Sequence, residues 1–190
     1  MADPQEAHFN SIPWCSKLVN DSNFIITGTR SRQPKSRTED ILIFKTLNSN
    51  ETIKAFLSLY KRPPPGEFWI EEVRVLVTLG TEMNGGPYML HGGIAATLMD
   101  EVLSILMTIN NETHQAEEHP SSTSAVTARL DVRYFRPVST PGTYLVVARC
   151  RERVGKKFIL EVEIRDGDGA VLVKADSVWI RVPRIYGSKL

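Results

Sequence analysis

The apolar residues between His91 and Ile109 recur at spacings of three and four. One face of this stretch is apolar and the opposite face is polar: Leu98, Val102, Ile105 and Ile109 against Thr97, Glu101, Ser104 and Thr108. Gly85-Gly86-Pro87 comes just before the stretch and Asn110-Asn111 just after it. This pattern predicts one buried helix of about five turns.

From Phe68 onward the period changes to two, which is typical of strands with one buried face. The first strand comes before the helix and four more follow it, with these apolar positions: Val73, Val75, Val77 and Leu79; Ala128, Leu130, Val132 and Tyr134; Tyr144, Val146, Ala148 and Cys150; Phe158, Leu160, Val162 and Ile164; Val171, Val173, Ala175 and Trp179. Asp166-Gly-Asp-Gly169 and the stretch 153–156 read as hairpin turns. A helix with so many apolar positions must be buried against other elements. We therefore expect an α+β fold in which an antiparallel sheet wraps the helix.

The first third of the chain lacks this alternation. Near Trp14 we expect a short amphipathic helix or an aromatic-anchored segment. A loop should follow from Thr27 to Thr38, and then a second helix with apolar positions from Ile41 to Leu59. His8 reads as an ordinary surface or capping residue. The predicted organisation is an N-terminal extension (1–67), a main domain (68–183) and a tail (184–190). Residues 111–124, with His114 and His119, read as a polar loop.

Composition narrows the function. With 23 basic and 22 acidic side chains the net charge is +1, which offers no footprint for nucleic acid. Cys15 and Cys150 provide neither a disulfide framework nor metal-site spacing, so no metal or cofactor is expected. Neither a signal peptide nor an apolar run of membrane-spanning length is apparent, so we expect a soluble, cytoplasmic protein.

Several basic side chains gather in the C-terminal half: Arg129, Arg133, Arg136, Arg149, Arg151, Arg153, Lys156 and Lys157. They form either a solvated face of the strands or a site for a phosphorylated ligand such as coenzyme A or a phosphopantetheine arm. Lys156 and Lys157 are the candidate ligand-binding pair.

The start of the central helix carries candidate chemistry. Gly92 and Gly93 would leave backbone N–H groups open to a ligand, where the helix dipole adds about half a positive charge. Asp100, about two turns further on, lies about 60° from the polar face and close to apolar residues. A donor for an oxyanion followed by a carboxylate suggests acyl chemistry. Alternatively, Asp100 is held in a salt bridge and the glycines only make a tight turn. Glu101, the rival carboxylate, reads as structural or solvated.

Two segments resemble a known family. His91-Gly-Gly-Ile-Ala-Ala-Thr-Leu-Met-Asp100 resembles the helix motif of hotdog-fold acyl thioesterases, most of all the phenylacetate-pathway and mammalian superfamily members. The stretch 126–137, which ends in Arg-Pro, looks like the family's next strand. The resemblance covers roughly 68–183, and residues 1–67 resemble extensions of fungal single-domain members. It implies a homodimer, or a tetramer, that acts on acyl-coenzyme A or an acyl carrier protein.

The resemblance also implies roles for single residues. Asp100 matches the general base or nucleophile, and Gly92 the glycine whose N–H polarises the thioester carbonyl. Thr127 matches a position that helps to place water, although it also fits an ordinary strand threonine. His91 would line the site, with Gly93 beside it for the substrate. Asn84 is the candidate for an Asn or Gln before the histidine, one residue further away than the family pattern has it.

Two other functions fit the same fold. A hydratase or dehydratase would need a catalytic histidine paired with a carboxylate, and that pattern is not apparent around His91. A non-catalytic acyl-binding protein would have no need of Asp100, Gly92 and Thr127 together. A serine hydrolase is disfavoured because Ser104 lacks the Gly-x-Ser-x-Gly elbow.

Overall fold

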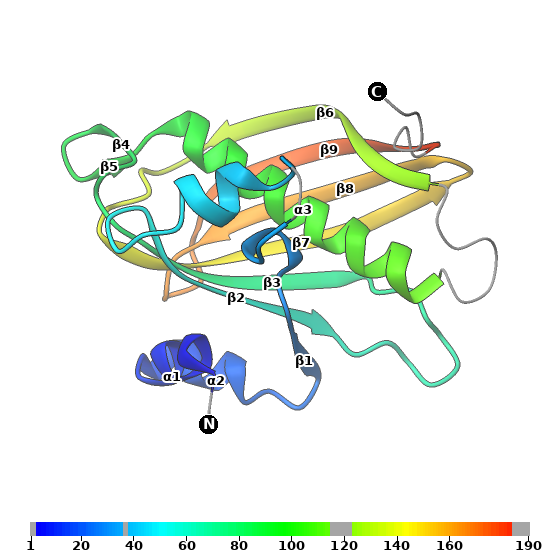
Figure 1. Ribbon diagram of the computed structural model, residues 1–190, viewed down its shortest axis with the longest axis horizontal. Coiled ribbons are helices and arrows are strands. Elements are labelled where there is room, and N and C mark those ends of the chain that lie inside the picture. The colour runs from blue at the N-terminus through cyan, green and yellow to red at the C-terminus, as the bar shows by residue number, and fades with distance from the viewer. Residues whose placement is uncertain (1–2, 36–37, 115–122, 184–190) are drawn as a thin grey trace.

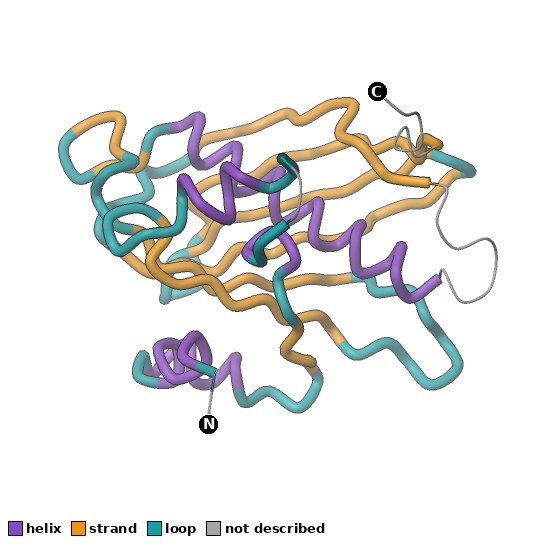
Figure 2. The backbone as a smooth tube through the Cα atoms, in the orientation of Figure 1, coloured by secondary structure: helices purple, strands orange, loops and turns teal. Residues whose placement is uncertain are grey.

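A large antiparallel sheet and one long helix make up the frame of the molecule. The computed structural model describes residues 3–35, 38–114 and 123–183. Seven strands form the sheet in the order β1-β2-β3-β7-β8-β9-β6, and α3 lies along one face (Figure 1) (Figure 2). The elements are α1 (Pro4–Asn10), α2 (Pro13–Val19), β1 (Phe24–Thr27), η1 (Arg30–Arg32), η2 (Leu42–Thr46), β2 (Ile53–Lys61), β3 (Glu72–Leu79), β4 (Asn84–Gly86), β5 (Met89–Leu90), α3 (Gly92–His114), β6 (Thr123–Tyr134), β7 (Gly142–Val154), β8 (Lys157–Arg165) and β9 (Val171–Pro183). The α+β prediction is confirmed.

Helix α3 buries its apolar face against the sheet, as its periodicity predicts. Leu98, Val102 and Ile105 belong to one core cluster with the inward residues of β3, β7, β8 and β9. By length and composition the stretch from Gly92 to Asn111 could also cross a bilayer. The core helix of a soluble protein meets the same criterion, so this stretch assigns no membrane location.

The helix does not end at the two asparagines. It continues through His114, and residues 115–122, which include His119 of the expected polar loop, lie outside the described residues. Asn110 is buried, and its amide oxygen accepts a hydrogen bond from the Ile70 N–H at 2.7 Å. Its amide nitrogen donates to the carbonyl oxygens of Ile70 (2.9 Å) and Leu106 (3.0 Å). Asn110, which the sequence pattern placed just after the helix, therefore anchors the chain segment that leads into β3.

Of the four predicted C-terminal strands, β7, β8 and β9 bury most of their apolar positions, whereas Ala128 and Tyr134 of β6 are exposed. The four strands form antiparallel pairs β7–β8, β8–β9 and β9–β6, and β7 also pairs with β3. The two predicted hairpin turns are present, with Gly155 at φ 57° and Gly169 at φ 85°. Glycine reaches these left-handed conformations without the steric cost that a side chain adds.

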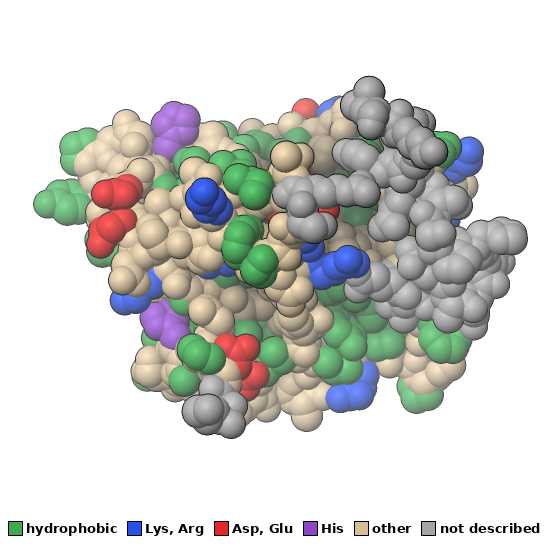
Figure 3. Space-filling model, in the orientation of Figure 1, with side chains coloured by type: hydrophobic (Ala, Val, Ile, Leu, Met, Phe, Trp, Pro, Cys, Tyr) green, Lys and Arg blue, Asp and Glu red, His purple; other side chains and the backbone are tan. Residues whose placement is uncertain are grey.

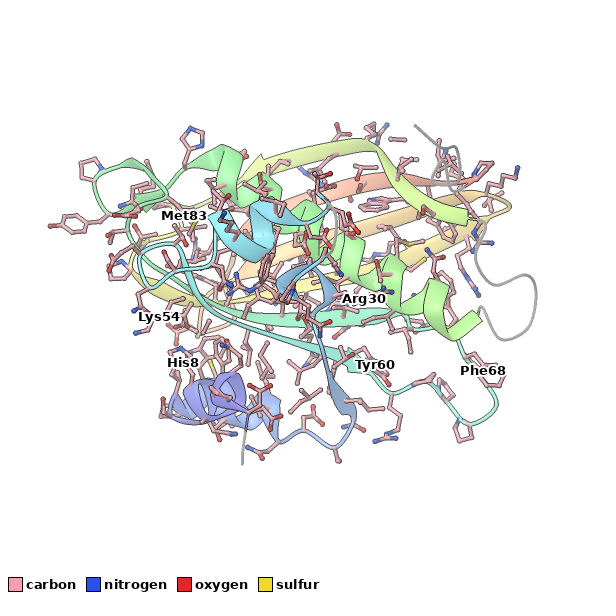
Figure 4. All side chains as sticks on the ribbon, viewed as in Figure 1. His8, Arg30, Lys54, Tyr60, Phe68 and Met83 are labelled. Atoms are coloured by element: carbon pink, nitrogen blue, oxygen red, sulfur yellow. The ribbon has the colours of Figure 1, made fainter. Side chains whose placement is uncertain are left out.

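The N-terminal region covers both faces of one sheet edge. Helices α1 and α2 pack on the face away from α3, where Phe9 and Cys15 contact Leu57 and Leu59 of β2. Burial raises the pKa of the Cys15 thiol to about 12. His8 lies between α1 and the sheet, with Nε2 2.9 Å from Thr78 Oγ1, so it is a packed residue and not a plain surface one (Figure 4).

After β1 the chain crosses to the face that carries α3. Thr29 Oγ1 lies 2.6 Å from Ser58 Oγ in a buried contact. Arg32 then donates hydrogen bonds to the carbonyl oxygens of Leu47 (3.0 Å) and Ile53 (3.2 Å). These contacts hold η1 and η2 over the helix (Figure 1), and on this face of the molecule hydrophobic and charged side chains lie close together (Figure 3).

The prediction of a second helix between Ile41 and Leu59 is wrong. Only Leu42–Thr46 forms a helical turn, of the π type, and Ile53–Lys61 is strand β2. Both faces of β2 are covered, so Ala55 through Leu59 are all buried. A strand that is buried on both faces reads as a continuous apolar run, which periodicity does not separate from a buried helix.

The basic residues of the C-terminal half mostly pair with carboxylates on the outer face of the sheet. Arg151 and Lys174 contact Glu161, Arg165 and Lys174 contact Glu163, and Arg149 contacts Glu72. Burial alone would raise the pKa values of Glu161 and Glu163, but hydrogen bonds from these cations outweigh burial and lower both. For these residues the solvated-face interpretation is favoured over a phosphate site.

The anchoring role of Asn110 gives a stability prediction. Asn110→Ala leaves the N–H and carbonyl of Ile70 without their partner in a buried site, which costs about 1–3 kcal/mol for each group. We expect a loss of roughly 2–4 kcal/mol in the free energy of unfolding, measured by urea denaturation. Asn111→Ala, at the less buried neighbouring position, is the control and should lie within about 0.5 kcal/mol of wild type. An equal loss of unfolding free energy in Asn110→Ala and Asn111→Ala would contradict the anchoring role of Asn110.

Candidate active site

Two of the predicted site residues are in direct contact. Thr127 Oγ1 donates a hydrogen bond of 2.7 Å to Asp100 Oδ1. The register of β6 against β9 shifts between Thr127 and Arg129, so a bulge occurs where the strand faces α3. Bulges commonly re-aim a side chain next to a functional site. Among the described residues Asp100 contacts the Thr127 hydroxyl and forms no salt bridge.

The start of α3 is capped by His91. The ring Nδ1 of His91 accepts a hydrogen bond from the Gly93 N–H at 3.0 Å. The backbone N–H of His91 donates to the Met83 carbonyl oxygen at 2.9 Å. The expectation that the Gly93 N–H is open to a ligand is therefore wrong. A Cβ at Gly93 would lie 3.1 Å from the His91 ring, so glycine allows this close capping contact. The Gly92 N–H makes no hydrogen bond to the described part of the chain.

Tyr134 is a site residue that sequence reasoning missed. It ends β6, and its hydroxyl donates a 2.8 Å hydrogen bond to the Gly92 carbonyl. The side chain is 54% exposed although it occupies an apolar position in the strand pattern. An exposed tyrosine just before Phe-Arg-Pro was the available signal, because a tyrosine combines an apolar ring with a hydrogen-bonding tip. Tyr134 ties the end of β6 to the first turn of α3.

Asn84 lies in the small hairpin that precedes α3. It pairs with Leu90 between β4 and β5, and its amide oxygen accepts a hydrogen bond from Thr140 Oγ1 at 2.5 Å. A Cβ at Gly85 would come within 3.0 Å of the His91 side chain. Glycine at position 85 thus lets the hairpin pack directly against His91, despite the extra residue between Asn84 and the histidine.

An open pocket of about 390 Å³ lies beside His91. Its lining residues are Glu82, Met83, Asn84, His91 and Ile94, together with Thr46, Leu47 and Thr52 from the N-terminal region. Met83 lies next to η2 in Figure 4. The structure thus brings His91 and Asn84 to one pocket, as the sequence predicts, and adds a wall that the sequence did not predict.

Lys156 and Lys157 lie at the other end of the helix. They are exposed in the turn between β7 and β8, next to Phe158. Phe158 stacks on Trp69, the residue before the Ile70 that Asn110 holds near the end of α3. Within one chain the structure does not bring the lysine pair to Gly92.

Glu101 is not solvated. Burial beneath the N-terminal segment raises its pKa, while Ser31 and Arg32 of η1 act in the opposite direction. Burial also lowers the pKa of Arg32, an effect that Glu101 opposes. The carboxylate therefore belongs to the contact between the N-terminal segment and α3, which favours the structural reading of Glu101.

Comparisons with known proteins point to one family. Residues 89–173 match the family model of the thioesterase superfamily. The chain is 24% identical over 204 residues to verlamelin biosynthesis protein B of a Lecanicillium species, a match that covers 93% of this chain and 88% of the relative. That coverage takes in most of residues 1–67.

Solved structures show the same fold. The thioesterase superfamily protein RHA08564 has a TM-score of 0.51 and 25% identity, with 65% of this chain covered and 55% of that chain. The PaaI protein of E. coli, from the phenylacetic acid degradation operon, has a TM-score of 0.50 and 17% identity, with 58% and 72% covered. This chain spans just over half of the first structure's length. The sheet wrapped around α3 is the hotdog fold, and residues 89–173 are similar to the thioesterase superfamily.

Proposed function

We propose that the protein hydrolyses acyl thioesters of coenzyme A or of an acyl carrier protein. The observation that carries the proposal is the 2.7 Å hydrogen bond from Thr127 to Asp100 at the bulge of β6. A hydroxyl that donates to one carboxylate oxygen fixes the carboxylate and leaves its second oxygen for a water molecule. Such a positioned base commonly contributes a factor of about 10²–10⁴ in rate.

The Gly92 N–H is the proposed donor to the thioester carbonyl. It lies at the positive end of the α3 dipole and is unpaired within the described chain. A fixed donor aimed at developing negative charge is worth a factor of about 10²–10³. The Tyr134 hydroxyl holds the Gly92 carbonyl at 2.8 Å and so restrains the orientation of the peptide that follows it.

The reaction then balances with these groups. Asp100 takes a proton from water while the water oxygen bonds to the thioester carbon. The carbonyl oxygen becomes negative and is met by the Gly92 N–H. When the carbonyl reforms, the C–S bond breaks and the thiolate leaves with the proton from Asp100.

A single chain does not bring the two catalytic groups to one carbonyl. Gly92 and Asp100 are eight residues apart on one helix, which corresponds to about 12 Å. Both groups must approach the same thioester within about 3 Å. The proposed site therefore combines Asp100 and Thr127 of one chain with Gly92 and His91 of a second copy.

Strand β6 is the proposed place for that second copy. Among the described strands it pairs only with β9, which leaves its other edge open to them, and open edges of this length readily pair with another strand. Large apolar side chains are exposed on or beside β6: Val126 (45%), Tyr134 (54%), Phe135 (56%) and Ile180 (40%). Antiparallel pairing of β6 with its copy would continue the sheet through a homodimer.

The first test addresses the carboxylate. Asp100→Asn keeps the side chain's shape and removes its basicity, so kcat for acyl-coenzyme A should fall by about 10²–10⁴ while binding changes little. Release of free thiol is the measurement, over a panel of acyl groups on coenzyme A and on a carrier protein. Glu101→Gln is the matched control and should retain most of the activity. If Glu101→Gln abolishes turnover and Asp100→Asn spares it, the assignment of the base is wrong.

The second test addresses the composite site. Gly92→Pro removes the donor N–H at the first helical position, where proline is tolerated sterically. Asp100→Asn and Gly92→Pro should each be inactive alone. Refolded together in equal amounts, they should recover about a quarter of wild-type activity, because half of randomly formed dimers are mixed and each has one intact site. Absence of recovery in chains shown to exchange would contradict a site shared between copies.

The third test addresses the lysine pair. If Lys156 and Lys157 contact phosphate groups of coenzyme A, the double change to Ala should raise KM severalfold and leave kcat unchanged, with an effect that weakens at high salt. Changing Lys17 and Lys61, also exposed, removes the same charge elsewhere and serves as the control. Equal KM values for the two double variants would return the pair to the solvated-face reading.

A further inference from the structure

The N-terminal segment builds one wall of the pocket beside His91. Thr46, Leu47 and Thr52 belong to this wall, and all three lie outside residues 89–173, the stretch that matches the thioesterase superfamily. We propose that this pocket receives the acyl group of the substrate and that the N-terminal segment sets the size of acyl group accepted. The inference rests on the proposed thioester hydrolysis and adds a determinant of specificity to it.

The pocket lies where an acyl group would need it. His91 and Ile94, which line it, flank the first turn of α3, and Gly92 lies between them in the sequence. An acyl chain whose carbonyl meets the Gly92 N–H is therefore within reach of this pocket.

The character of the pocket indicates an apolar occupant of limited size. Leu47 and Met83 are 7% and 5% exposed and contribute apolar surface together with Ile94. Thr46 and Glu82 are exposed and stand at the rim. A volume of about 390 Å³ is near the lower end of the roughly 300–1,000 Å³ found for small-molecule sites. A short, largely apolar acyl group fits this description better than a long chain.

The wall is held in place before any ligand binds. Arg32 donates a hydrogen bond of 3.0 Å to the carbonyl oxygen of Leu47, which directly follows Thr46. It donates another of 3.3 Å to the carbonyl oxygen of Ile43, three residues before Thr46. Thr52 is fixed from the other direction, since its Oγ1 accepts a hydrogen bond from the Ser49 N–H at 3.0 Å. A wall that is already ordered discriminates between ligands without the entropic cost of forming it on binding.

The test narrows the pocket from its rim. Thr46→Trp places a bulky side chain at an exposed lining position, and Lys45→Trp places the same side chain at the neighbouring exposed position, which does not line the pocket. The probes are unreactive acyl-pantetheine analogues with a methylene group between carbonyl and sulfur, in a series of increasing acyl length. Calorimetry measures their affinity, and thiol release from the matching thioesters is measured in parallel.

We expect Thr46→Trp to weaken binding of the longer analogues by about tenfold or more and to spare the shortest, because pocket fit changes affinity by about 10–200-fold for each methylene group. Lys45→Trp should match wild type throughout. Leu47→Ala, which enlarges the pocket, should shift the preferred acyl length upward. These three results together would establish the N-terminal wall as the determinant of acyl length.

Two results would overturn the inference. One is the same length profile for Thr46→Trp, Lys45→Trp and wild type. The other is wild-type binding that does not vary with acyl length. A protein that binds the analogues with the expected profile but releases no thiol would contradict the proposed hydrolysis and leave this pocket assignment standing.

Discussion

The need to cover α3 on every side governs the rest of the structure. One face of the helix is a continuous apolar stripe, and the curved sheet buries it through Leu98, Val102 and Ile105. Burial of this kind is the main favourable contribution to folding. On its outer side, η1 and η2 cover the helix and bury Glu101 against Arg32. The polar face that the sequence displays is thus only partly exposed to solvent, and the N-terminal region is part of the frame that fixes the helix.

The same covering decides where chemistry is possible. The start of α3, with Gly92, and the side that faces β6, with Asp100, are the parts of the helix left near the surface. The bulge in β6 brings Thr127 to Asp100, and Tyr134 at the end of the strand reaches Gly92. The edge strand β6 therefore contacts both Asp100 and Gly92. These two groups stay apart because they lie at different heights along the same helix.

The sequence predicted those parts of the fold in which apolar and polar residues alternate with a clear period. The stripes of α3, and the alternation at Val73, Val75 and Val77, gave the right element types because each shows the period of its own element. Prediction failed where both faces are covered, as in β2, where Ala55 to Leu59 form an unbroken buried run. Asp100 and Thr127 were found through a family resemblance. Tyr134 and the capping of Gly93 by His91 depend on distances between elements that no local pattern records.

The two ends of the sheet differ in a way that bears on how copies of the protein assemble. At one end β1 has only four residues, and the chain then turns back over the face that carries α3. At the other end β6 presents twelve residues. A sheet with an unpaired strand at both edges can add copies at each edge and grow into an open-ended fibre. A sheet with one such edge closes after a single twofold pairing. In the proposed dimer the N-terminal region covers the other sheet edge, so assembly would stop at two copies. The protein would then not polymerise through β6, the strand on which the proposed site depends.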